Sequence, residues 1–270
     1  MNFLVDCIFS CYNPWSNNIV LTIKFTYLKG RIFMRTAIES FKKLIKKYRH
    51  AWVLLYGFIY FPWFTYLERH NASEYFFIHS PLDDYIPFVE YFIVPYLLWF
   101  AFIAAAILYF LFTDKEGFYK LTAFLFTGMT IFLIICSIFP NALQLRPETF
   151  ARDNIFVDMV RALYQTDTPT NVLPSMHVFN SLGVAIAIYH SKALKKHPAI
   201  QISSYCLAGL IILSTVFLKQ HSVTDVIAAF ALACIIYPLV YATQPKKITK
   251  VGAHTRPGNT GKEGRLGQNP

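Results

Sequence analysis

Two histidines and one aspartate stand at spacings that suit chemistry. His221 and Asp225 are four residues apart, so on a helix they lie on one face, one turn apart. A carboxylate there accepts the Nδ1 proton of the imidazole, which leaves Nε2 as a free base or nucleophile. His177 lies upstream by roughly the length of one helical hairpin. If the chain brings the histidines together, His177 can protonate a departing oxygen or take a proton from water.

Two further residues suit an anion. Pro174 is compatible with the first turn of a helix, so Ser175 offers a hydroxyl and backbone N–H groups at a positive helix end, which favours an anion. Arg146 supplies a planar fork for phosphate oxygens. A nucleophile, an orienting carboxylate, a proton donor and an anion cradle together indicate transfer of a phosphoryl group through a phosphohistidine.

The composition indicates a membrane protein. Of the 270 residues, 55% are hydrophobic and only 15% are charged, whereas a soluble domain has about 25% charged residues. A net charge of +10 would also suit nucleic-acid binding. The Lys and Arg residues stand in the gaps between apolar runs, however, which is the membrane pattern. We therefore expect membrane lipids as partners, and no nucleic acid.

The apolar runs predict six membrane-spanning helices, each near the ~20 residues that cross a bilayer. The expected fold class is all-α, an integral membrane six-helix bundle, with residues 51–243 as the catalytic domain. The polar segment 68–90 is expected to be an interfacial or lidding loop, and 140–173 a longer polar loop. The expected spans are residues 51–67, 91–113, 118–139, 174–189, 199–218 and 222–241.

The two ends of the chain are expected to lie outside the bundle. Residues 1–50 form a basic segment, in which 39–49 has the spacing of a basic amphipathic helix that suits an anionic membrane surface. We interpret residues 1–33 as an upstream extension before Met34. Residues 244–270 are rich in Lys, Gly, Pro and Asn without periodicity, and are expected to be disordered.

Charge distribution predicts the orientation of the bundle. Six spans place both termini on one side, and that side receives 20 of the 25 Lys and Arg. The positive-inside rule then makes both termini cytoplasmic. It follows that Arg146, His177 and His221 meet at the extracytoplasmic face of a multi-pass cell-membrane protein, although the charge count used neither histidine.

These residues resemble the motifs of the type 2 phosphatidic acid phosphatase superfamily, integral membrane enzymes with a six-helix core. The family pattern is Lys-x6-Arg-Pro, then Pro-Ser-Gly-His, then Ser-Arg-x5-His-x3-Asp. Arg146-Pro147 matches the end of the first motif, residues 174–177 match the second except for Met176 at Gly, and Ser214, His221 and Asp225 match the third. The resemblance covers about residues 90–240.

The resemblance implies an enzyme that needs no metal or other cofactor. By this resemblance His221 is the nucleophile, Asp225 its partner and His177 the general acid/base. Arg146, Ser175 and Ser214 would line the phosphate.

The chain departs from the family at two cations. Phe139 stands where the family has Lys, and Thr215 where it has Arg. Lys219 is our candidate to replace one of them in phosphate binding, and Arg152 the other. The Ser-Thr form of the third motif is similar to that of the inositol phosphorylceramide synthase branch.

The first functional expectation is hydrolysis of a lipid or isoprenoid phosphoester at the extracytoplasmic face. The alternative is a head-group phosphotransferase, in which the alcohol of another lipid replaces water. A third interpretation is a non-catalytic membrane transporter or binding protein. A fourth is a metal site formed by His177, His221 and Asp225.

Overall fold

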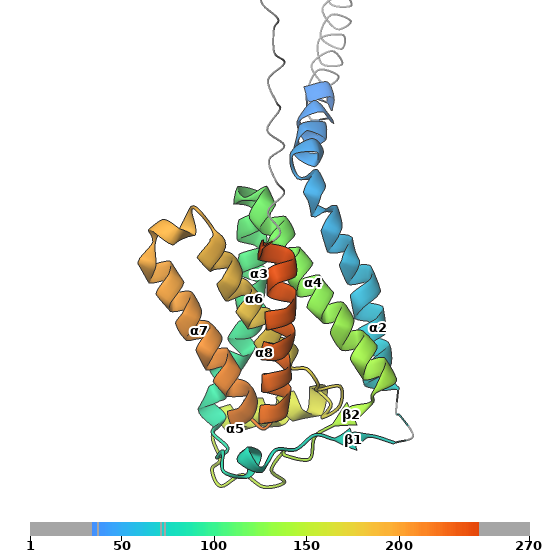
Figure 1. Ribbon diagram of the computed structural model, residues 1–270, viewed down its shortest axis with the longest axis vertical. Helices are drawn as coiled ribbons and strands as arrows, with labels where there is room; N and C mark the ends of the chain where they lie inside the picture. Colours follow the sequence, from blue (N-terminus) through green and yellow to red (C-terminus); the bar gives the residue numbers. More distant parts are fainter. Residues whose placement is uncertain (1–33, 37, 71, 73, 243–270) are drawn as a thin grey trace, which may run out of the picture.

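The computed structural model describes residues 34–36, 38–70, 72 and 74–242 (Figure 1). The predicted extension 1–33 and the predicted disordered tail 244–270 lie outside the described residues. The described chain is mostly helical, as predicted, and residues 38–47 of the basic segment are helical. The α-helices are α2 (Gly57–Arg69), α3 (Ile93–Thr113), α4 (Lys115–Ile138), α5 (Ile155–Thr166), α6 (Met176–His190), α7 (Pro198–Phe217) and α8 (Val223–Tyr237).

Shorter elements connect and extend these helices. The 3-10 helix η1 runs into α2, η3 runs into α3, and the π-helical turn η5 continues α8. Two short strands pair in parallel, Phe76 with Asn141 and Phe77 with Ala142. The bounds are η1 (Arg49–Tyr56), β1 (Phe76–Phe77), η2 (Pro81–Asp84), η3 (Glu90–Phe92), β2 (Asn141–Ala142), η4 (Leu194–Lys196) and η5 (Pro238–Ala242).

Each of the six apolar segments is helical, and four of these helices are long and apolar enough to cross a membrane. Among the described residues these four are Glu90–Thr113, Lys115–Ile138, Pro198–Phe217 and Val223–Ala242. The other two helices are shorter: α2 has 13 residues and α6 has 15. The structure therefore supports a membrane-embedded helical protein, while six spans remain a prediction.

Helix α6 occupies the middle of the bundle (Figure 1). It packs against α3, α4, α7 and α8. Small residues allow the close approach of α4: a Cβ built on Gly128 would lie 2.0 Å from Cε1 of Phe179, and one on Gly183 would lie 2.7 Å from Cδ1 of Phe124. The rings of Phe124 and Phe179 stack between the two helices with centroids 4.7 Å apart. This packing fixes the helix that carries His177.

One end of the bundle is covered by the polar segments. The predicted polar loop 140–173 contains a helix, α5, which lies across that end (Figure 1). Asn154 starts α5, because its side-chain oxygen accepts the N–H groups of Phe156 and Val157. Val157 and Val160 then face inward. The segment 68–90 contributes β1 and η2 to the same end.

The segment 68–90 is fastened to the start of α8. The buried carboxylate of Asp83 accepts hydrogen bonds from the Ser222 hydroxyl at 2.6 Å and the Val223 N–H at 2.8 Å. The ammonium of Lys219 donates to the carbonyls of Asp83 and Ile86 at 2.7 and 2.6 Å. These bonds connect the outer segment to the residues on either side of His221.

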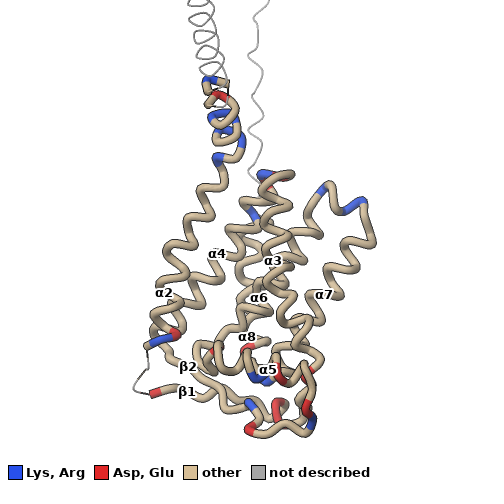
Figure 2. The backbone as a smooth tube through the Cα atoms, turned by 180° about the vertical axis from the view of Figure 1, so that it is seen from behind, with Lys and Arg blue, Asp and Glu red and all other residues tan. Residues whose placement is uncertain are grey.

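Charge is distributed unequally between the two ends of the bundle (Figure 2). The Lys and Arg residues gather where α3 joins α4 and α6 joins α7, and on the helix before η1. The opposite end, around α5 and β1, carries most of the acidic residues.

Candidate active site

The pair His221 and Asp225 lies at the start of α8. Asp225 is fully buried, and its Oδ2 lies 3.4 Å from Nδ1 of His221. The same oxygen accepts the backbone N–H of Ser222 at 2.8 Å. The helix therefore begins with a capping box whose acidic member also faces the histidine. His221 itself lies before the helix, in the turn, and its Nδ1 faces the carboxylate at ion-pair distance without a hydrogen bond to the described residues.

A tight turn after α7 presents the imidazole. The carbonyl of Thr215 accepts the N–H groups of both Gln220 and His221, at 2.9 and 3.0 Å. Lys219 adopts a positive φ of 53° inside this turn, a conformation that residues with a Cβ seldom adopt. The two bonds from its ammonium to the outer segment hold it there.

His177 lies in the first turn of α6, next to His221. The two imidazole rings have centroids 5.8 Å apart. The His177 ring is also in contact with two rings of α3, those of Tyr96 at 4.4 Å and Trp99 at 4.2 Å. Its Nε2 is buried and makes no hydrogen bond to the described residues. Aromatic contacts thus fix the ring and leave one nitrogen for a ligand.

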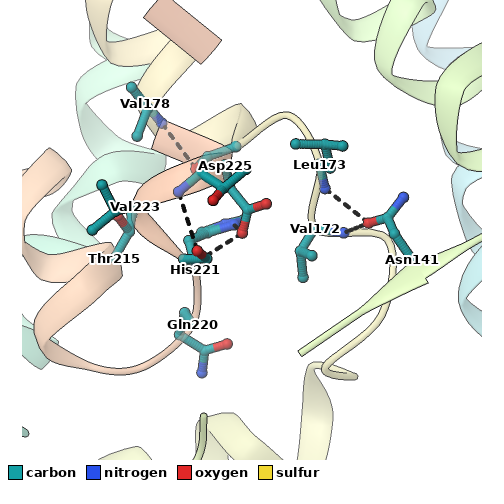
Figure 3. Close-up of polar contacts among 12 residues, drawn as sticks. Asn141, Val172, Leu173, Val178, Thr215, Gln220, His221, Val223 and Asp225 are labelled. Atoms are coloured by element: carbon teal, nitrogen blue, oxygen red, sulfur yellow. Dashed lines mark hydrogen bonds and ion pairs between the residues drawn. The ribbon is translucent and has the colours of Figure 1, made fainter. Parts of the chain in front are cut away.

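The segment that leads into His177 is held by an amide that we did not predict. Asn141, in β2, is fully buried, and its Oδ1 accepts the N–H groups of Val172 and Leu173 at 2.8 and 2.9 Å (Figure 3). The Ser175 N–H then donates to the carbonyl of Asp225 at 3.2 Å. Through these bonds α6 and α8, which carry His177 and Asp225, start beside each other.

A cavity of about 450 Å³ opens at the two histidines. One part of its wall is apolar and comes from α2, α3 and α4. The other part is polar and comes from the end of α2, α5, the segment after it, the start of α6 and the turn before α8. The apolar wall includes Tyr60, Phe61, Phe64, Leu97, Phe100 and Phe132, and the polar wall includes Glu68, Asp167, Thr168, Asn171, His177, Gln220 and His221.

Arg146 stands behind this polar wall and does not line the cavity among the described residues. Its Nη1 donates to the carbonyls of Tyr164 and Asp167 at 3.2 and 2.8 Å. Its Nη2 donates to Oε1 of Gln220 at 2.8 Å. The guanidinium also lies over the ring of Tyr164, 4.6 Å from the centroid. Burial lowers the pKa of Arg146, against the opposing effect of Asp167.

The other predicted phosphate-binding residues are spread around the site. Ser175 and Ser214 are fully buried: Ser175 Oγ accepts the N–H of Val178 at 3.5 Å, and Ser214 Oγ donates to the carbonyl of Ile211 at 2.6 Å. Lys219 uses two of its N–H groups on the outer segment. Arg152 forms an ion pair with Glu90 at 3.0 Å.

Two acidic residues line the cavity, and neither was predicted as part of the site. Glu68 accepts hydrogen bonds from Asn171 at 2.9 Å and from the Thr168 hydroxyl. Asp167 accepts a long bond, 3.5 Å, from the Tyr96 hydroxyl. Burial raises the pKa of Asp167, while the Arg146 guanidinium and His221 lower it in part. The position of Asp167, a few residues before the Pro-Ser-x-His motif, was the only sequence signal for it.

The described residues contain no group of three or more His, Cys, Asp and Glu side chains arranged to hold a metal ion. The expected set His177, His221 and Asp225 thus forms no such cluster in the described part of the chain. Asp225 is committed to His221 and to the Ser222 N–H.

The comparison with family models gives one match. Residues 121–249 match the model of the PAP2 superfamily. This stretch belongs to the PAP2 superfamily. It contains all three motifs on which the predicted resemblance rested, from Arg146 to Asp225.

Members of the PAP2 superfamily are generally phosphatases or phosphotransferases, which supports an enzyme acting on a phosphorylated lipid in a membrane. The match does not confirm that the third motif is similar to that of the inositol phosphorylceramide synthase branch. No curated protein and no solved structure matched the chain.

Proposed function

We propose that the protein is a membrane phosphatase that hydrolyses a lipid or isoprenoid phosphoester through a phosphohistidine at His221. The observation that carries the proposal is the meeting of His221, Asp225 and His177 at one cavity. The imidazole of His221 faces a buried carboxylate on one side, and His177 lies beside it with a free nitrogen.

The proposed reaction has two steps. Nε2 of His221 attacks phosphorus, the bond from phosphorus to the ester oxygen breaks, and protonated His177 gives its proton to the departing alkoxide. Neutral His177 then takes a proton from water, whose oxygen attacks phosphorus, and the P–N bond breaks to release phosphate. Asp225 stabilises the charge on His221 during both steps. Ser175, Ser214 and Lys219 remain the proposed phosphate-binding residues, Lys219 with the one ammonium N–H that its two carbonyl bonds leave over, and Arg146 supports the phosphate site from behind the polar wall.

The walls of the cavity support a lipid or isoprenoid substrate. Aromatic and aliphatic side chains of α2, α3 and α4 form one side, and the two histidines lie at the polar side. A substrate with an apolar chain and a phosphate would place each part against a matching wall. The charge distribution supports an extracytoplasmic site, because the histidines lie at the end opposite the Lys and Arg clusters.

A phosphotransferase is the second candidate, and Asp167 favours it. This carboxylate lines the cavity with His177 and His221 and has one long hydrogen bond from Tyr96. An acceptor oxygen at that position suits the hydroxyl of an alcohol. In this reaction an alcohol takes the place of water in the second step, and an inositol phosphorylceramide synthase-like head-group transfer would be one example.

The deciding experiment is phosphate release by the purified full chain in detergent. A mixture of phosphatidic acid, polyprenyl diphosphate and sphingoid phosphate is offered with EDTA present. We expect release by the parent and none by His221→Ala, whereas His197→Ala, an exposed histidine at the far end, should behave as the parent. New phospholipid products without phosphate would favour the transferase. If neither appears, a transporter or binding protein becomes the better interpretation, and activity that requires added zinc would favour a metal site.

A further inference from the structure

Gln220 is a buried amide with one half of its hydrogen-bonding capacity unused. The residue is 4% exposed, and its Nε2 makes no hydrogen bond to the described residues. It lines the cavity with His177 and His221 and directly precedes His221 in the chain. A buried donor without a partner is costly, so a ligand in the cavity is its natural acceptor.

Arg146 decides which way the amide faces. A guanidinium only donates hydrogen bonds, so the atom of Gln220 that contacts Nη2 must be the oxygen. The two N–H bonds of Nε2 are then left for the cavity. The positive charge behind the amide polarises it, and polarised donors bind anions more strongly.

We propose that Gln220 binds a phosphoryl oxygen of the substrate through Nε2, and that Arg146 acts through Gln220 as a positioning residue. The proposal rests on the proposed function and refines it, because it puts an amide between the phosphate and the arginine. Gln220 also adds a hydrogen-bond donor to a site that lacks two cations of the family, because Phe139 and Thr215 stand at their positions in the sequence. Gln220 shares the Thr215 carbonyl with His221 as its backbone anchor, so the donor and the nucleophile are held by one turn.

The test measures, by calorimetry, the affinity of the purified full chain for orthovanadate and for inorganic phosphate. Gln220→Glu keeps an oxygen for Arg146 and replaces the donor by a second, negative oxygen. We expect binding to weaken about ten- to a hundredfold, the loss typical of one hydrogen bond to a charged group, with an unchanged or higher Tm. Gln165→Glu, at an exposed position on α5, makes the same charge change and should bind as the parent. Gln220→Met is the second variant if Gln220→Glu does not fold.

A double-mutant cycle tests the role of Arg146. If Arg146 acts through Gln220, the variant Arg146→Met/Gln220→Met binds orthovanadate no more weakly than Gln220→Met alone. Additive losses would mean that Arg146 contacts the phosphate itself, and would overturn that part. Parent-like binding by Gln220→Glu would overturn the role of Gln220 while leaving the phosphatase intact. A parent chain that neither binds orthovanadate nor turns over lipid phosphates would overturn both proposals.

Discussion

At the scale of single residues, Asp225 caps α8 and also faces His221, and one substitution can separate these two contributions. Its Oδ2 accepts the Ser222 N–H and faces Nδ1 of His221. In Asp225→Asn the amide oxygen still accepts the Ser222 N–H, so α8 still begins there, but the charge that supports a phosphorylated imidazole is lost. We expect phosphate release to fall by roughly 10⁴-fold, as in other Asp–His pairs, with a Tm near that of the parent. Full activity of this variant would count against His221 as an activated nucleophile.

Asp167 should make stability depend on pH. Burial raises its pKa above the ordinary 3.8. The folded protein then holds this proton more tightly than the unfolded chain, so the carboxyl favours folding at low pH and that contribution is lost as the pH rises through the raised pKa. Asp167→Asn should therefore increase Tm at neutral pH, by an amount that shrinks as the pH falls towards about 4.

Thermal unfolding in detergent across this pH range measures the effect of Asp167→Asn. Asp153→Asn is the control, because that carboxylate is 85% exposed and should give no such gain. An increase that does not change with pH would contradict the assignment of a raised pKa to Asp167.

Local spacing predicted which side chains lie close together at the candidate site, while their roles stay predictions. His221 and Asp225 lie close together as their spacing predicted, but His221 lies in the turn before α8 rather than on the helix, and the capping box of α8 brings the carboxylate to it. The roles of Gln220 and Asp167 were not predictable, because each depends on where Arg146 lies in space. Arg146 was predicted as a direct phosphate ligand, and the structure finds Gln220 between its guanidinium and the cavity.

At the scale of elements, the contact of α4 with α6 should control the position of His177. A Cβ at Gly128 would lie 2.0 Å from Phe179, which is two residues after His177. Gly128→Ala must displace that ring or the helix. We expect a loss of about 1–3 kcal/mol in the free energy of unfolding and a lower rate of phosphate release.

Gly209→Ala is the matched control for Gly128→Ala. Gly209 also lies within a helix, but nothing lies within 4 Å of an added Cβ. Here alanine should leave activity unchanged and stabilise the helix by up to about 1 kcal/mol. Thermal unfolding and the phosphate assay, run on both variants, measure the difference. Equal effects of the two substitutions would mean that close approach of α4 and α6 is not what Gly128 provides.

Apolar runs predicted the helices of the bundle well, and the polar end poorly. Runs of about 20 apolar residues allow few structures other than a helix. Helix α5 is short and amphipathic, so its charged residues concealed the spacing of Val157 and Val160. The parallel pair of β1 and β2 joins Phe76 to Asn141 across a large sequence separation, and no local pattern indicates such a contact.

At the scale of the whole molecule, the charge asymmetry carries a prediction about orientation. The end with α5 and the histidines should be extracytoplasmic, and the end with η4 cytoplasmic. The orientation can be measured by labelling single introduced cysteines, in a chain whose own cysteines are replaced by alanine. Asp153→Cys and Lys196→Cys are suitable, because both positions are exposed: Asp153 stands just before α5, and Lys196 lies in η4, between α6 and α7.

A membrane-impermeant maleimide applied to intact cells should label Asp153→Cys at once, and Lys196→Cys only after the membrane is opened. The reverse pattern would invert the orientation while leaving the chemistry of His221 untouched, since that rests on contacts inside the fold. The outcome also decides which leaflet supplies the substrate. The phosphate of a lipid stays at the membrane surface, so only the leaflet at the histidine end can present it to the cavity without moving the head group through the bilayer.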